Sequence, residues 1–138
     1  MLKIDIIPVL QDNYSYLIHE EESNITAIID PSESLPIIEV IKKKNLNLNF
    51  ILNTHHHFDH IGGNMELKNL TGAKIIAHEK DSSRIEGVNI KVKDLDEFVI
   101  GNSKAIVIHL AGHTKNHVAY FFPKELIVFT GDTLFSAG

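Results

Sequence analysis

Residues 54–63 read THHHFDHIGG and place four histidines and one aspartate within six positions. The run follows residues 50–54, an apolar stretch typical of a buried strand, so the polar cluster falls at the carboxyl end of that strand. Active sites of α/β proteins collect at the carboxyl ends of strands. A single histidine here would be interpreted as a solvated loop residue, but four with an aspartate indicate a functional site.

The spacing within this cluster suits metal ions. In extended backbone the side chains at i and i+2 point the same way, so His55 and His57 can converge on one cation while His56 points elsewhere. Asp59 and His60 follow as the chain turns into a predicted helix, and they can approach a second cation from another direction. A helical alternative would pair His56 with His60, as in HExxH zinc enzymes, but the general-base glutamate and the helical context are missing. The cluster therefore predicts a two-metal site.

Two further motifs each come directly after a predicted strand. His113 lies in a Gly-His-Thr tripeptide and Asp132 in a Gly-Asp-Thr tripeptide. A carboxylate such as Asp132 can bridge two divalent ions about 3.5 to 4 Å apart. Taken alone, each tripeptide would more often be an ordinary turn. Their significance comes from the histidine cluster that precedes them.

Composition narrows the class of protein. The 138 residues are 43% apolar and carry a net charge of -5, which argues against a nucleic-acid partner. We expect one domain over residues 1–138, large enough to form a core without disulfides. With no cysteine in the chain, a metal must be bound by imidazole and carboxylate. No apolar stretch approaches the ~18 residues of a membrane helix and no signal peptide is recognisable, so we expect a cytoplasmic protein without a membrane partner.

The apolar pattern predicts a mixed α/β fold. A helix is expected after Ser34 as N-cap, ending at residues 42–44, and a second helix over residues 64–70, closed by Gly72. The first three strands are expected to form an antiparallel meander. The predicted strands cover residues 4–10, 14–19, 25–30, 50–54, 73–77, 98–100, 105–110, 118–122 and 126–130.

The histidine cluster resembles the HxHxDH signature of the metallo-β-lactamase superfamily, in which the Gly-His-Thr and Gly-Asp motifs supply a third histidine and a bridging aspartate. Three segments are more similar to glyoxalase II, the hydroxyacylglutathione hydrolase family. They are VLQDNYSYLI at residues 9–18, IDP at 29–31 and GDTLF at 131–135. The resemblance runs along the whole chain in order and implies an αββα sandwich.

The resemblance also implies a ligand set and a reaction. The first metal would be bound by His55, His57 and His113, the second by Asp59 and His60, and both by Asp132. Asp59 and Asp132 would also be catalytic, and Asp30 would orient a ligand histidine. Zinc is the metal we expect, and iron or manganese would suit the same ligands. The implied reaction is hydrolysis of S-2-hydroxyacylglutathione thioesters to a 2-hydroxy acid and glutathione, in methylglyoxal detoxification.

The sequence departs from the family pattern in two places. Residues 111–117 read AGHTKNH where the family commonly has PGHTxGH, which changes the turn but keeps the ligand histidine. The family's last metal-binding histidine and its helical glutathione-binding domain would follow residue 138. We therefore expect the N-terminal portion of the fold, truncated at its C-terminal side, with an exposed sheet that favours dimers or aggregation.

Other interpretations remain open from the sequence. The chain could be another hydrolase of the superfamily, such as a lactonase or a β-lactamase-like enzyme, a sulfur dioxygenase with one iron, or a catalytically silent metal-binding fragment. Among the remaining histidines, we expect His19 to be solvated, His109 to be buried and hydrogen-bonded, and His78 to be on the surface. His117 is expected to pack beneath the site without binding metal, and Arg84 has no assigned role.

Overall fold

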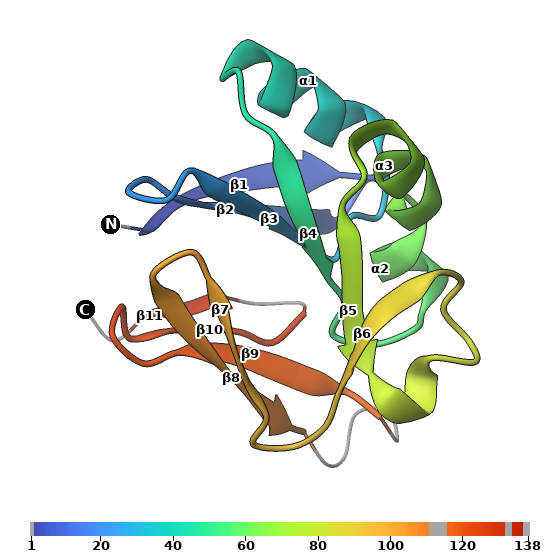
Figure 1. The fold of residues 1–138 in the computed structure, drawn as a ribbon. Helices are drawn as coiled ribbons and strands as arrows, with labels where there is room; N and C mark the ends of the chain where they lie inside the picture. Colours follow the sequence, from blue (N-terminus) through green and yellow to red (C-terminus); the bar gives the residue numbers. More distant parts are fainter. Residues whose placement is uncertain (1, 111–115, 132–133, 137–138) are drawn as a thin grey trace.

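The computed structural model describes residues 2–110, 116–131 and 134–136. Two β-sheets face one another, and helices cover the outer side of the first sheet (Figure 1). The predicted αββα sandwich is thus present as one layer of helices and two sheets. Among the described residues no helix lies over the second sheet, and none is long and apolar enough to cross a membrane.

The first sheet has six strands in sequence order. They are β1 (Leu2–Val9), β2 (Asn13–Glu20), β3 (Ile25–Ile29), β4 (Leu48–Leu52), β5 (Lys74–His78) and β6 (Val88–Val92). The predicted meander is confirmed, since β1, β2 and β3 pair antiparallel, whereas β3 to β6 pair parallel. Strand β6 was not predicted, although its segment VNIKV alternates apolar and polar residues, because it is only five residues long and follows a stretch with no strand pattern.

The parallel strands are connected by helices. These are α1 (Leu35–Lys43), α2 (Phe58–Ile61), α3 (Asn64–Thr71) and the 3-10 turn η1 (Glu79–Asp81). Helix α1 begins after Ser34 as predicted, but the hydroxyl of Ser34 donates to Glu66 of α3 at 2.6 Å and makes no capping bond. Helix α3 ends at Gly72, whose φ of 76° is the left-handed cap conformation that favours glycine.

The second sheet is antiparallel throughout. Its strands, β7 (Glu97–Ile100), β8 (Ser103–His109), β9 (Val118–Phe122), β10 (Ile127–Phe129) and β11 (Leu134–Ser136), follow the order β11-β10-β9-β8-β7. The four strands predicted for this half correspond to β7 to β10. Short turns join them, which is typical of a meander.

Two apolar layers hold the fold together. One lies between the sheets and includes Ile18, Ile29, Leu52, Phe122 and Phe129. The other lies between the first sheet and its helices and includes Ile28, Ile37, Ile51, Leu67 and Ile75. Neighbours in sequence on β3 and β4 thus face opposite layers, because these central strands are buried on both faces.

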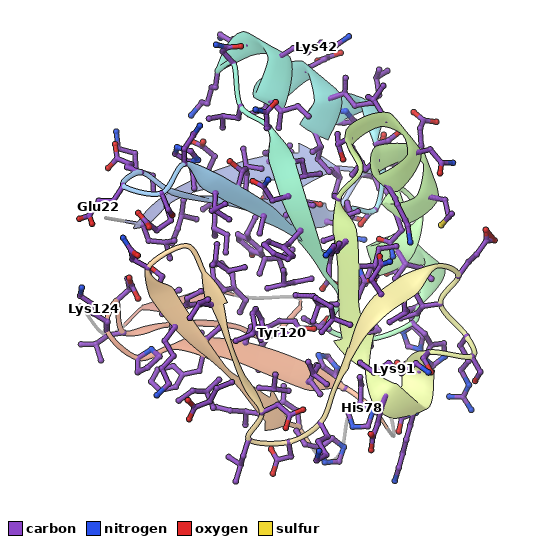
Figure 2. All side chains as sticks on the ribbon, viewed as in Figure 1. Glu22, Lys42, His78, Lys91, Tyr120 and Lys124 are labelled. Atoms are coloured by element: carbon purple, nitrogen blue, oxygen red, sulfur yellow. The ribbon has the colours of Figure 1, made fainter. Side chains whose placement is uncertain are left out.

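A buried carboxylate joins the two sheets at one end. Glu20, at the end of β2, accepts hydrogen bonds from the hydroxyl of Ser23 at 2.7 Å and from the backbone N–H groups of Glu22 and Asn102. These bonds lower the pKa of Glu20 to about 2, since they favour its charged form. Figure 2 shows Glu22 at this end of the molecule and His78 at the opposite one.

Candidate metal centre

The chain leaves β4 into the segment that carries the histidine cluster, and several contacts hold this segment in place. The side-chain amides of Asn53 and Asn64 exchange hydrogen bonds of 2.6 and 3.2 Å, which tie the segment to the start of α3. The hydroxyl of Tyr120 donates to the carbonyl of Asn53 at 2.6 Å. Figure 2 shows Tyr120 in the layer between the sheets, so β9 supports the cluster from below.

The backbone of Asp59 is held from two other segments. Its carbonyl accepts hydrogen bonds from the side chain of Asn13, at 2.9 Å, and from the hydroxyl of Ser32. Asn13 starts β2 and belongs to the QDNY stretch, and Ser32 follows the IDP stretch. One of the three segments that resemble glyoxalase II, and the residue directly after another, therefore contact the loop that carries the histidine cluster.

His55 and His57 lie together, as the strand alternation predicts. Their ring centroids are 4.7 Å apart, with the rings nearly perpendicular. A ring nitrogen of His55, a ring nitrogen of His57 and a carboxylate oxygen of Asp59 all lie within 4.8 Å of one another. His55 is buried, whereas His57 and Asp59 are exposed, so this group opens to solvent. Two imidazoles and a carboxylate at this spacing fit a divalent cation.

His60 joins the cluster from α2. His55, His60 and Asp30 form a second group whose ligand atoms lie within 4.8 Å. Asp30 follows β3, and both of its carboxylate oxygens are already engaged. Oδ1 accepts from the backbone N–H of Thr54 at 2.8 Å, and Oδ2 accepts from the Thr54 hydroxyl at 2.6 Å and lies 3.1 Å from Nδ1 of His60. With both oxygens engaged, Asp30 is placed to orient Thr54 and His60.

The hydrogen-bond chain around Thr54 also sets the histidine tautomers. The single hydroxyl proton of Thr54 goes to Asp30, so Thr54 Oγ1 accepts from Nδ1 of His55 at 2.9 Å. Nδ1 of His60 donates to the same carboxylate of Asp30. In both histidines Nε2 then keeps its lone pair, which is the form that binds a metal.

Burial prepares His55 further as a ligand. Its side chain is 5% exposed, and loss of solvation lowers its pKa to about 4. The nearby rings of His60, His117 and His57 lower it as well, while the negative charge of Asp30 opposes the shift. His55 is therefore neutral at pH 7, the form in which an imidazole can bind a cation without first losing a proton.

The structure thus brings four predicted ligands together: His55, His57, Asp59 and His60. The other two, His113 and Asp132, lie outside the described residues. His56 points away from the group, as predicted, and its Nδ1 lies 3.4 Å from the carboxylate of Asp81. Sequence reasoning did not single out Asp81, which lies 25 residues further along and carries no motif.

The other histidines correct two expectations. His78 is 7% exposed rather than on the surface, because it ends β5 next to His109 of β8. Its burial lowers its pKa. His109 is exposed rather than buried, since it ends β8 at the rim of the sheet, and its ring centroid lies 5.8 Å from that of His78. His19 is half-buried, with Nδ1 2.8 Å from the hydroxyl of Thr26.

His117 packs beneath the site, in agreement with its predicted place. Its ring stacks on His55 with centroids 4.7 Å apart and an interplanar angle of 24°. Its Nε2 lies 2.6 Å from the carbonyl oxygen of Thr130, which connects the site to the end of β10. Arg84 is half exposed, with Nη1 3.8 Å from Asp81.

The chain is similar to known proteins along its length. The family model described as the metallo-beta-lactamase superfamily matches residues 10–138. The chain belongs to the metallo-beta-lactamase superfamily. Within the superfamily it is 50% identical over 137 residues to a hydroxyacylglutathione hydrolase of Pelagibacter ubique, covering 99% of this chain and 57% of that protein. It is 45% identical over 138 residues to a hydroxyacylglutathione hydrolase of Methylococcus capsulatus, covering 100% and 54%.

These matches confirm the similarity to glyoxalase II. The 138-residue chain spans about half the length of the curated relatives it matches. Among solved structures, BLEG-1 B3 metallo-beta-lactamase superposes with a TM-score of 0.81 at 27% identity, covering 99% of this chain and 74% of that one. ETHE1 from Myxococcus xanthus superposes with a TM-score of 0.77 at 24% identity, covering 94% and 56%. The metallo-β-lactamase fold is therefore confirmed.

Proposed function

We propose that residues 1–138 form a metal-binding domain of a glyoxalase II type hydrolase, which acts on S-2-hydroxyacylglutathione thioesters and releases a 2-hydroxy acid and glutathione. The observation that carries the proposal is 50% identity over 99% of the chain to a protein named hydroxyacylglutathione hydrolase. The partner is then a small-molecule thioester, and we place the reaction in the cytoplasm, in methylglyoxal detoxification.

The proposed ligand set keeps all six predicted residues. His55, His57 and His113 would bind the first ion, Asp59 and His60 the second, and Asp132 would bridge them. Zinc fits these nitrogen and oxygen donors, as do iron and manganese. Divalent ions in such a site lower the pKa of water and polarise a carbonyl oxygen.

The described residues contribute orientation and charge. Asp30 holds Nδ1 of His60, so Nε2 of His60 faces Asp59, whose Oδ2 lies 3.7 Å away. The Asp59 side chain is 53% exposed, so a substrate carbonyl or a water molecule can reach it from solvent. Because a thiolate is a good leaving group, this reaction needs less help from a general acid than amide hydrolysis does.

A chimera tests the proposal. In the Pelagibacter ubique hydrolase, residues 1–138 of this chain would replace the half that they match, and rates would be measured on S-lactoylglutathione, a lactone and a β-lactam. We expect the thioester to be hydrolysed fastest, and His57→Ala in the same chimera to abolish the activity. A folded, metal-loaded chimera that is inactive on thioesters, or faster on the lactone or the β-lactam, would refute the proposed substrate class.

The isolated chain should bind metal but turn over thioesters slowly. Orientation of the substrate can account for several kcal/mol of a barrier, and this chain covers only 57% of that relative. The first proposed ion has four ligands and the second has three, counting Asp132 for both. We therefore expect one tightly and one weakly bound ion per chain by elemental analysis after dialysis. Two equally tight ions would contradict this ligand assignment.

A further inference from the structure

Asp81 is a buried carboxylate that the candidate metal groups do not include. It ends η1, directly after β5, and its side chain is 1% exposed. Burying an ionised carboxylate is costly unless donors surround it. The hydrogen-bond donors around Asp81 therefore identify the segments of the chain that its carboxylate holds together.

Among the residues that the structure describes, three side chains approach the carboxylate of Asp81. The amide of Asn116 donates to Oδ1 at 2.9 Å, and both partners are buried. Nδ1 of His56 lies 3.4 Å from Oδ1 and from Oδ2. Arg84 is the most distant, with Nη1 3.8 Å from Oδ1, and it is half exposed. The bond from Asn116 is thus the shortest and best shielded from water.

The partners of Asp81 belong to the segments that carry proposed metal ligands. His56 lies between His55 and His57 in the loop after β4, and its Nδ1 faces Asp81. Asn116 follows His113 by three residues in the sequence. One carboxylate outside the metal groups therefore binds two ligand-bearing segments that are about 60 residues apart in sequence.

We propose that Asp81 is a positioning residue of the metal centre. Its carboxylate ties the segment of His55 and His57 to Asn116, and so fixes the backbone that carries these two candidate ligands. The bond to Asn116 carries most of this effect. The proposal rests on the proposed metal site, but it is independent of the thioester as substrate.

Metal affinity of the whole 138-residue chain tests the proposal, with Co(II) as the probe and a competing chelator. We expect Asp81→Ala and Asn116→Ala each to weaken Co(II) binding about tenfold, the lower end of what loss of an outer partner of a ligand costs. The double variant should bind no more weakly than Asp81→Ala alone, because both changes remove the same bond. Asp81→Asn keeps an acceptor for Asn116 and should restore binding to within about threefold of the wild type.

Two further readouts separate positioning from general stabilisation. The visible absorption bands of bound Co(II) should shift in Asp81→Ala and return in Asp81→Asn. Asp5→Ala is the matched control, since Asp5 is an exposed aspartate that pairs only with surface Lys44 among the described residues, and it should leave both affinity and spectrum unchanged. Should Asp81→Ala fail to fold, Asn116→Ala gives the same comparison.

An Asp81→Ala or Asn116→Ala chain that is folded and binds Co(II) with wild-type affinity and spectrum would overturn the proposal. Additive losses in the double variant would also overturn it, because the two residues would then act separately. A wild-type chain that binds Co(II) while the chimera fails to cleave thioesters would refute the proposed function alone. The affinity comparison would remain valid in that case.

Discussion

Oδ2 of Asp30 lies 3.1 Å from Nδ1 of His60, and the same oxygen accepts the hydroxyl proton of Thr54. One carboxylate thereby orients two histidines, since Thr54 in turn contacts Nδ1 of His55. Asp30 adopts this place with a φ of 49°, in the left-handed region that aspartate and asparagine tolerate better than most residues. The candidate ligands His55 and His60 therefore depend on a residue that precedes them by 25 and 30 positions.

Asp30→Asn should weaken metal binding by about tenfold while leaving the fold intact. Asparagine keeps the size and the left-handed backbone, but it replaces one acceptor oxygen by an N–H donor that faces the donors of Thr54 and His60. Chelator competition measures the effect. Asp5→Asn, on the surface, is the control, and equal affinities of the two variants would show that Asp30 does not orient the ligands.

His57→Ala should lower the metal-to-protein ratio sharply, because His57 supplies a ligand atom to the solvent-exposed group. Elemental analysis after dialysis measures this ratio. His19→Ala is a suitable control, since His19 lies on β2 and contacts Thr26 rather than any proposed ligand. A His57→Ala chain with an unchanged ratio would remove His57 from the ligand set.

The metal-free protein should lose stability as the pH falls from about 6.5 to 4. In this window the unfolded state protonates His55, whereas the folded state, with the His55 pKa near 4, keeps it neutral. The loss attributable to His55 should reach at most about 3 kcal/mol, since one pKa unit corresponds to about 1.4 kcal/mol. Urea unfolding in EDTA at pH 7 and pH 4.5 measures it. His55→Gln, which has no titrating group, should show a smaller difference between the two pH values than the wild type.

Glu20→Gln should lower the melting temperature at pH 7, because the carboxylate that joins the two sheets loses its charge. The folded pKa of Glu20, about 2, lies below its usual 4.5, so its contribution is present above pH 4.5 and is lost as the pH falls towards 2. The difference between wild type and Glu20→Gln should therefore shrink over this range in thermal unfolding. Glu39→Gln, exposed on α1, should differ little from the wild type at either pH.

Gly63→Ala should destabilise the protein by about 1 to 3 kcal/mol, the usual range for overpacking. A Cβ at Gly63 would lie 2.8 Å from backbone atoms of Glu33 and Ser34, which cannot move aside as a flexible side chain can. Gly72→Ala meets no such contact, although its positive φ adds strain of about 1 to 2 kcal/mol. Chemical denaturation of both variants in EDTA measures the difference. A Gly63→Ala chain as stable as wild type would show that the loop after α2 is not packed against residues 31–34.

Some features missed by sequence reasoning share one physical cause. The segment of β6 is only five residues long, and it is paired along the edge of β5, which lies ten or more residues earlier in the chain. His78 and His109 were assigned the wrong exposure, since their burial depends on which strands end beside them. The contacts of Asp81 with His56 and Asn116 join residues 25 and 35 positions apart, and no local spacing predicts them.

The sequence alone determined the local features of this protein: the strand before the cluster, the opposite directions of His56 and its two neighbours, the helix ends and the superfamily. Each of these follows from the period of the backbone or from a contiguous motif. Tertiary structure decided which distant side chains complete the site, namely Asp30 on His60, His117 on His55, and Asp81 beneath His56. Asp30 and Asp81 reach the histidine cluster because β3, β4 and β5 run parallel and end at one edge of the first sheet, whereas His117 reaches it from the start of β9 in the second sheet. A one-residue change of register would turn the side chains of these strands to the other face.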